Sequence, residues 1–470
     1  MSATATTEKK YLKWYQKLAY GSGDLASNCS YGLVSSFVLL YLTGTLGLDS
    51  AIIGSLMLAS KVLDGISDVI FGTLIDRTHS KLGKARPWML FGQVGVSLCL
   101  FLLFAIPAGS TTMQYIYFFI VYTALNAVFY TANGIAYSSL VALITKNNNE
   151  RVQLGSFRFM FAVVTNIFMG FAVTGMVEKF GSGAAGWRTT ALIFAIVGLV
   201  VNTISCLAVK ELPEEELSGN TSEAAEEGKA VAEEKKHGFA ETAKILVHNK
   251  YYLMILAIYI VYYIMSNLTT GAGVFCATYY WGDGSLLGQF SMMKMFPVII
   301  ALAIAPVLIK KTGSMQKVNF WGYAISSVLG IPMIYFAMQK NLSMFLLFMF
   351  IKGIFAGTLS GSLNALIAEA SGYTTRTTGI HMDGMMYSCS SLGVKVGGGI
   401  GTAAVGWLLK LGGFVGTATV QSESAIRMIF NLYITFPFVI GIIITVLLAF
   451  LDVENANKKW DAEHQKEAQA

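Results

Sequence analysis

The 470-residue sequence is short of charge and of proline. Charged residues make up 13% of it and prolines number 7, whereas an ordinary soluble domain carries about 25% charge. So small a charged fraction cannot cover the water-facing surface of a long chain, while the high apolar content excludes a disordered one. The five cysteines form no C-x-x-C pair and no zinc-ligand spacing, which argues against a disulfide scaffold or a zinc site. No basic stretch interleaved with aromatic residues indicates nucleic acid as a partner.

Hydrophobic residues, by contrast, make up 54% of the chain. A membrane-spanning helix needs roughly 20 mostly apolar residues, and the sequence predicts twelve of them. They cover 20–47, 51–75, 87–107, 114–145, 156–178, 189–209, 251–281, 287–309, 318–338, 342–367, 379–409 and 425–451. The polar segment 210–250 divides them six and six, which predicts an all-α membrane protein with bundles at 20–209 and 251–452. A basic lead-in at 1–19 and a tail at 453–470 complete the chain.

The distribution of Lys and Arg predicts the orientation. If both termini are cytoplasmic, 24 of the 33 basic residues fall in inner segments and five in outer ones. Because inner loops carry the excess of Lys and Arg, we expect cytoplasmic N and C termini. The first 18 residues lack the apolar core of a signal peptide, so we expect a basic approach to the first span.

Span 51–75 contains three charged residues that hydrocarbon disfavours. Lys61, Asp64 and Asp68 follow the spacing i, i+3 and i+7, which places them on one side of a helix. Ionisable residues at membrane depth are costly and indicate a functional site. Two carboxylates a turn apart can supply oxygens to a monovalent cation or share a proton, and Lys61 would balance one of them when the site is empty. A structural salt bridge that locks two helices is the alternative.

Polar residues in other spans are further candidates for a cavity. In span 20–47, Asp24 and Asn28 belong to a polar stripe, although Asp24 would equally cap the start of the span. Arg158 would line the cavity or contact a phospholipid headgroup. The remaining candidates in the first half are Asn126, Thr131 and Asn133.

In the second half, span 379–409 places Ser391 and Lys395 on one face. Lys395 would pair with an aspartate of the first half or donate to substrate oxygens. We interpret the glycines at 397–399 as a packing surface or flexing point, because no strand precedes them as in a phosphate loop. Lys294 and Lys352 would snorkel from near a span end, and no role is assigned to them.

Four ordered motifs carry a family resemblance over nearly all twelve spans. GTLIDRTHSKLGKARPW (72–88) resembles the loop signature of the major facilitator superfamily. YGSGDLASN (20–28), KVLDGISD (61–68) and YSCSSLGVK (387–395) resemble the glycoside–pentoside–hexuronide:cation symporter family, of which the melibiose permease is the best-known member. The resemblance implies the major facilitator fold and bacterial import of sugars or glycosides with Na⁺, H⁺ or Li⁺.

The resemblance also implies residue roles. The cation would be bound by Asp64 and Asp68, with oxygens from Ser67 and Thr131. Substrate would be bound by Asn28, Arg158 and Lys395, to which the spacing analysis adds Asp24, Asn133 and Ser391. Two runs on the sugar side, NGIAY (133–137) and EASGYTTRTTGIHMDG (369–384), depart from the family pattern, so melibiose itself is not expected.

We therefore predict a symporter of the bacterial cytoplasmic membrane that imports a glycoside, oligosaccharide or related sugar with Na⁺ or H⁺. It would need no cofactor and no metal beyond a possible Na⁺ at Asp64 and Asp68. Its partners would be the lipid bilayer and the small-molecule substrate, with no protein partner required. A proton-coupled carrier of an anionic, hexuronide-like glycoside is one alternative. A membrane sugar sensor without flux is another, and an enzyme is disfavoured because no Ser/His or metal constellation lies in the spans.

Overall fold

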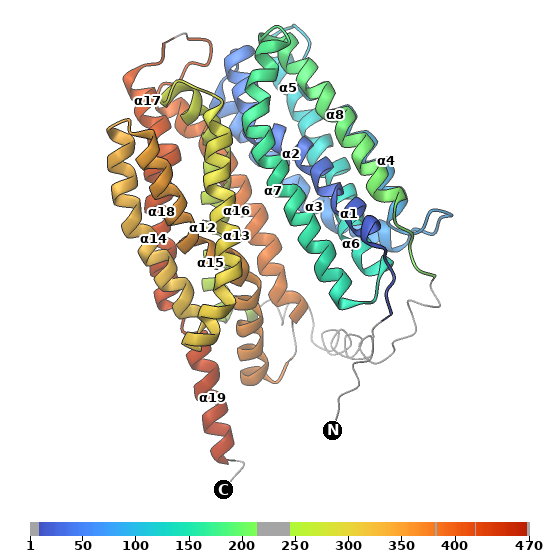
Figure 1. The fold of residues 1–470 in the computed structure, drawn as a ribbon, viewed down its shortest axis with the longest axis vertical. Helices are drawn as coiled ribbons and strands as arrows, with labels where there is room; N and C mark the ends of the chain where they lie inside the picture. Colours follow the sequence, from blue (N-terminus) through green and yellow to red (C-terminus); the bar gives the residue numbers. More distant parts are fainter. Residues whose placement is uncertain (1–8, 214–244, 381–382, 419, 468–470) are drawn as a thin grey trace. The chain divides into compact units, whose positions relative to one another are not determined.

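The computed structural model describes residues 9–213, 245–380, 383–418 and 420–467, and within these ranges every regular element is a helix (Figure 1). The chain forms two compact units. The first comprises residues 1–219 with the short segments 283–288 and 409–422, and the second comprises 220–282, 289–408 and 423–470. The predicted central loop, 210–250, lies mostly outside the described residues.

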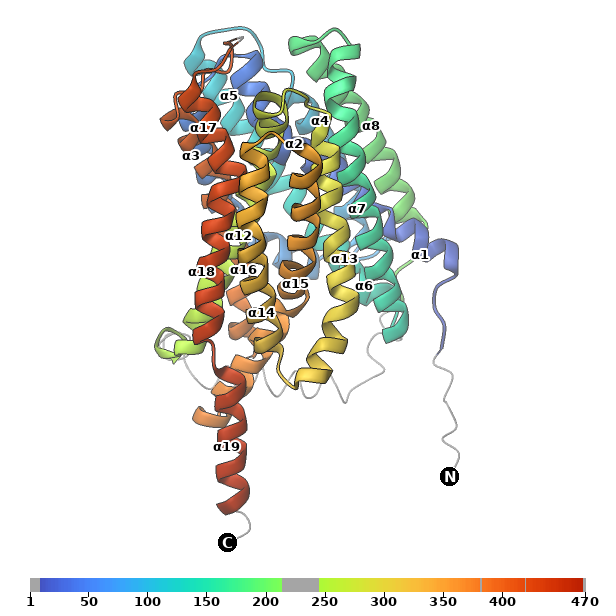
Figure 2. The same ribbon diagram turned by 60° about the vertical axis from the view of Figure 1, so that its left-hand side comes forward.

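The first unit contains six long helical stretches. They are α1 (Trp14–Gly21) with α2 (Gly23–Leu40) and the π-helical turn η1 (Tyr41–Thr45), α3 (Ser50–Asp76), α4 (Arg86–Leu103), α5 (Thr111–Thr123) with η2 (Ala124–Tyr130) and α6 (Thr131–Ile144), α7 (Asn148–Lys179), and α8 (Gly183–Leu207). Figures 1 and 2 show α2, α4 and α8 side by side, and α3 packs on α6. This packing turns the charged face of α3 toward α6.

The second unit contains the other six stretches and a further helix. They are α12 (Lys250–Phe275) with η3 (Cys276–Tyr280), α13 (Leu286–Thr312), α14 (Met315–Met338), α15 (Leu342–Thr378), α16 (Asp383–Leu411), and α17 (Glu423–Phe430) with η4 (Asn431–Thr435) and α18 (Phe436–Phe450). The helix α19 (Val453–Glu467) then follows α18 toward the C terminus (Figure 1).

The twelve predicted spans all correspond to long helices. Eleven described helices are long and apolar enough to cross a membrane by length and composition, and α3, with 27 residues, is the twelfth long stretch. The predicted ends were wrong where helices continue past the apolar run. The span predicted to end at residue 367 continues as α15 to Thr378, because polar residues at a helix end need no burial in lipid.

A carboxylate caps the third span of each unit. After α8, Glu211 accepts hydrogen bonds from the backbone N–H groups of Lys84, Ala85 and Arg86 at 2.7–3.0 Å, where α4 begins. After α18, Glu454 accepts from the N–H groups of Met315 and Gln316 at 2.8 and 3.0 Å, where α14 begins. An acid at a helix N-terminus satisfies unpaired N–H groups and complements the helix dipole. This contact ties the start of α19 to the start of α14, although the sequence predicted only a tail at 453–470.

Candidate functional site

The charged face of α3 borders a cavity of about 420 Å³ inside the first unit. Five of the predicted residues lie on its wall, and they come from three elements: Lys61, Asp64 and Asp68 from α3, Asn126 from η2, and Thr131 from α6. The other lining residues from η2 and α6 are Tyr130, Gly134, Ile135, Ser138 and Ser139. The structure thus brings together two carboxylates, one ammonium group and several hydroxyl or amide side chains.

Asp64 contacts two other residues that line this cavity, Lys61 and Thr131. The Lys61 Nζ lies 3.6 Å from Asp64 Oδ2, and both side chains are largely buried, at 19% and 13% exposed. On its other oxygen, Asp64 Oδ1 accepts a hydrogen bond of 2.6 Å from the Thr131 hydroxyl. One oxygen of Asp64 therefore faces an ammonium group and the other a hydroxyl.

Thr131 is positioned by an irregularity in its helix. It follows the π-helical turn η2, and its hydroxyl also lies 2.9 Å from the Asn126 carbonyl oxygen, five residues earlier. Single π-helical turns inside α-helices frequently occur at functional sites. Because a hydroxyl has one hydrogen to donate, Asp64 and the carbonyl compete for it. The Thr131 oxygen can therefore reorient when the occupancy of the cavity changes.

Ser67, predicted to add an oxygen, is placed differently. Its hydroxyl donates to the Asp64 carbonyl oxygen at 2.9 Å, and Ser67 is not among the residues that line the cavity. Gly134 lines it instead, with nothing within 4 Å of the position that a Cβ would take. The cavity is thus open on the side of α6 where the sequence departs from the family pattern.

A second polar cluster joins α2, α6 and α7. Arg158 Nε donates to Asp24 Oδ2 at 2.6 Å, and the Tyr137 hydroxyl donates to the same oxygen at 3.3 Å. The guanidinium carbon of Arg158 lies 4.2 Å from the centre of the Tyr137 ring, a cation–π contact. The structure thus gives Asp24 an ion-pair partner rather than a capping role and gives Arg158 a protein partner rather than a headgroup. Sequence reasoning missed Tyr137, which carries no charge to signal it.

One turn further along α2, Asn28 meets an amide that the sequence analysis did not single out. Asn28 Nδ2 donates to the Asp24 carbonyl at 2.7 Å, and its side-chain oxygen accepts from Asn166 Nδ2 at 2.9 Å. Asn166 follows Arg158 by eight residues on α7, so both lie on one helix face. That spacing was a signal that could have found it.

Asn133 is not among the residues that line the cavity beside α3. It is buried, 3% exposed, and donates to Gln93 Oε1 at 2.6 Å between α6 and α4. That Asn133 binds substrate stays a prediction, since one residue along a helix turns a side chain by about 100°. Gly134, its neighbour, takes the cavity-facing position.

In the second unit, Ser391 is exposed and Lys395 is half-buried on α16. The predicted pairing of Lys395 with an aspartate of α2 or α3 joins residues of different units, and it stays a prediction. The glycines of this helix have a packing role: a Cβ at Gly393 or Gly397 would lie 2.4 Å from atoms of α12. This supports the packing-surface interpretation.

Comparison with known proteins gives the family. The model of a family described as MFS/sugar transport protein matches residues 19–455, nearly the whole chain. The chain belongs to this family. As a member of a transport family, it is a multi-pass membrane carrier and not an enzyme.

Individual relatives agree with the resemblance to glycoside:cation symporters. The chain is 26% identical to the isoprimeverose transporter of Lactiplantibacillus pentosus over 98% of this chain and 93% of that protein. It is 24% identical to the putative glycoside/cation symporter YagG of Escherichia coli over 94% and 92%. The crystal structure of a D-xylose–proton symporter superposes with a TM-score of 0.60 at 12% identity, covering 92% of this chain and 97% of that one. That likeness confirms the major facilitator fold.

Proposed function

We propose that this carrier is a secondary active symporter that imports a glycoside, an oligosaccharide or a related sugar together with Na⁺ or H⁺. The observation that carries the proposal is the cavity in which Asp64, Asp68, Lys61 and Thr131 meet. Buried acids are costly in hydrocarbon and persist where an ion or a proton visits them. The relatives named as an isoprimeverose transporter and a glycoside/cation symporter support the substrate class.

Lys61 would act as an internal counter-ion. In the structure its ammonium group lies 3.6 Å from Asp64, so the empty site keeps its charge partly balanced. An incoming cation would take over the carboxylate oxygens and the Thr131 oxygen, and Lys61 would withdraw. The cation would then replace Lys61 as the partner of the carboxylate. If the carrier binds the cation with different affinity in its inward-open and outward-open states, binding shifts the equilibrium between those states.

Sugar would be held by amide, guanidinium and hydroxyl donors. In the first unit such groups are offered by the hydrogen-bonded pair of Asn28 and Asn166 and by Arg158. In the second unit Lys395 would be the donor. Cation and sugar affinities would be coupled, and that coupling must be reciprocal. The carrier would lie in a bacterial cytoplasmic membrane with both termini on the inner side and act without a protein partner.

The decisive experiment uses the purified full chain in sealed vesicles. Accumulation of labelled neutral and anionic glycosides is measured under imposed Na⁺ or H⁺ gradients. Asp64→Asn and Asp68→Asn should abolish gradient-driven accumulation while leaving binding or exchange. Glu178→Gln, which removes an exposed carboxylate at the end of α7, is the matched control and should accumulate normally.

The outcomes separate the alternatives. Normal accumulation by both aspartate variants would refute the cation assignment. Accumulation of anionic glycosides alone, driven by protons, would favour the hexuronide-like carrier. Binding without accumulation under any gradient would favour a sensor.

A further inference from the structure

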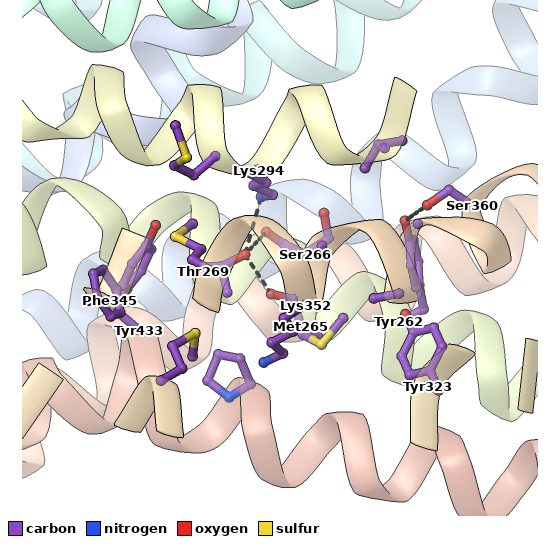
Figure 3. Close-up of a pocket in the computed structure, with 18 residues that line it drawn as sticks. Tyr262, Met265, Ser266, Thr269, Lys294, Tyr323, Phe345, Lys352, Ser360 and Tyr433 are labelled. Carbon is purple, nitrogen blue, oxygen red and sulfur yellow. Dashed lines mark hydrogen bonds between the residues drawn. The ribbon is translucent and has the colours of Figure 1, made fainter. Parts of the chain in front are cut away.

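A second cavity is lined only by residues of the second unit, from α12, α13, α14, α15, η4 and α18 (Figure 3). Its volume is about 180 Å³, below the roughly 300–1,000 Å³ of pockets that enclose a whole drug-sized ligand. Four methionines and four aromatic residues are among its 18 lining residues. Two lysines, Lys294 of α13 and Lys352 of α15, also line it.

Both lysines lie deep in the unit. Lys294 is eight residues from the start of α13 and Lys352 is ten residues from the start of α15. At 1.5 Å per residue these positions are about 12 and 15 Å along their helices, near the middle of a hydrocarbon core of about 30 Å. Their positions argue against the snorkelling expected from the sequence.

The wall around the lysines, as far as the structure describes it, contains neither Asp nor Glu. The Lys294 ammonium donates to the hydroxyls of Thr269 and Thr270 at 3.2 and 3.1 Å, and Figure 3 shows it reaching toward Thr269. For Lys352, the described part of the chain provides neither a hydrogen bond nor an ion pair. A buried charge without a counter-charge is costly, so an anion bound at this cavity would stabilise two ammonium groups at once.

Hydroxyl groups complete the wall. Tyr262 and Ser360 share a hydrogen bond of 2.8 Å. Tyr323 and Tyr433 are 2% and 8% exposed, and within the described ranges their hydroxyls have no hydrogen-bond partner. Ammonium and hydroxyl groups both donate hydrogen bonds, and an anion can accept hydrogen bonds from both.

We propose that Lys294 and Lys352 form a binding site for a small anionic group in the second unit. The shared chemistry is a single negative charge with several lone pairs. The occupant is either a free inorganic anion such as chloride or the carboxylate end of a larger solute, since the volume suits one ion or one end of a molecule. The site is separate from the cation cavity of α3 and does not depend on the proposed symport.

The test measures anion binding to the purified full chain. The readout is the shift of the thermal unfolding midpoint at constant Na⁺ concentration and constant ionic strength. Constant ionic strength is kept with the sodium salt of a bulky polyanion. The probes are sodium chloride, sodium acetate, methyl glucuronide and, as the uncharged match, methyl glucoside. The variants are Lys294→Met and Lys352→Met, which keep the length of the side chain. Lys310→Met, which removes an exposed lysine near the end of α13, is the control for general salt effects.

We expect at least one anionic probe to raise the midpoint of the unmodified chain and of Lys310→Met. Each cavity variant should bind that probe at least about tenfold more weakly, because a hydrogen bond to a charged group is lost. In the absence of small anions, Lys294→Met and Lys352→Met should unfold at the same or a higher temperature, which shows that they fold.

The probes also identify the source of the anion. Chloride binding that leaves methyl glucuronide without effect assigns the site to a free ion. Glucuronide binding that chloride displaces, with no cavity-dependent response to methyl glucoside, assigns it to the acid group of a solute. The proposal is overturned if no anion shifts the midpoint, or if the cavity variants respond as Lys310→Met does. Because binding is measured without transport, failure here leaves the proposed symport untouched.

Discussion

Thr131→Val isolates the oxygen that α6 contributes to Asp64. Valine keeps the branched shape of threonine and removes the hydroxyl that donates to Asp64 Oδ1 at 2.6 Å. A hydrogen bond to a charged group contributes about 1.5–3 kcal/mol, which corresponds to about a tenfold to hundredfold change in an equilibrium constant. If Na⁺ is the coupling ion and Thr131 is one of its ligands, the apparent Na⁺ affinity should fall by that factor.

The dependence that changes distinguishes the two ions. For a Na⁺-coupled carrier, Thr131→Val should alter the Na⁺ dependence of uptake. For a proton-coupled carrier, it should alter the pH dependence instead, because the hydroxyl that bonds the carboxylate is lost. The assay is glycoside uptake into vesicles, first as a function of Na⁺ at fixed pH and then as a function of pH without Na⁺.

Thr131→Ser is the matched control, because it keeps the hydroxyl and loses only a methyl group. It should retain the ion dependence of the unmodified chain. If Thr131→Val leaves both the Na⁺ and the pH dependence unchanged, the hydroxyl takes no part in ion binding, and the cavity wall formed by α6 is only structural.

Three further predictions test the rest of the first unit. Lys61→Met should raise the apparent Na⁺ affinity about tenfold, because the ammonium at 3.6 Å no longer competes for the carboxylate; a Na⁺ titration showing weaker binding would contradict the counter-ion role. Asp24→Asn or Arg158→Gln alone should lower the thermal unfolding midpoint more than the two together, because each leaves a largely buried charge unpaired; an additive loss in the double variant would argue against this. Asn166→Ala should weaken glycoside binding as much as Asn28→Ala, with no further loss when combined, since the two amides act as one pair; binding of a labelled glycoside measures this, and independent effects would exclude a joint site.

The spans could be predicted from the sequence because lipid demands long apolar helices. The contacts made by residues just beyond the spans could not be predicted. Nothing in the sequence around Glu211 or Glu454 distinguishes them from the other acidic residues outside the spans. Each nevertheless caps a helix that is far away in the chain. Such contacts depend on which helix ends meet after packing, and hydropathy along one segment holds no information on that.

The same limit applies to the candidate site. Spacing within α3 predicted that Lys61 and Asp64 would share a face, and the structure places them within 3.6 Å. Spacing within one helix does not say which helix lies opposite, so the pairing of Asp24 with Arg158 was not predicted, although both residues were candidates. Asn133 is a further case: the sequence offered it as a cavity residue, and the partner that the structure gives it is Gln93 on another helix, which spacing along one helix could not indicate.

The interpretation of the α16 glycines as a packing surface leads to a stability prediction. A Cβ at Gly397 would lie 2.4 Å from the Ile260 carbonyl oxygen of α12, and a backbone atom cannot move aside as a side chain can. Gly397→Ala should therefore separate the two helices and cost about 1–3 kcal/mol, as overpacking does. On α7, Gly175 has nothing within 4 Å of its Cβ position, so Gly175→Ala should be neutral or stabilising by about 0.5–1 kcal/mol. Unfolding midpoints of the two purified variants measure the difference, and equal stability would mean that α16 and α12 are not held at this close approach.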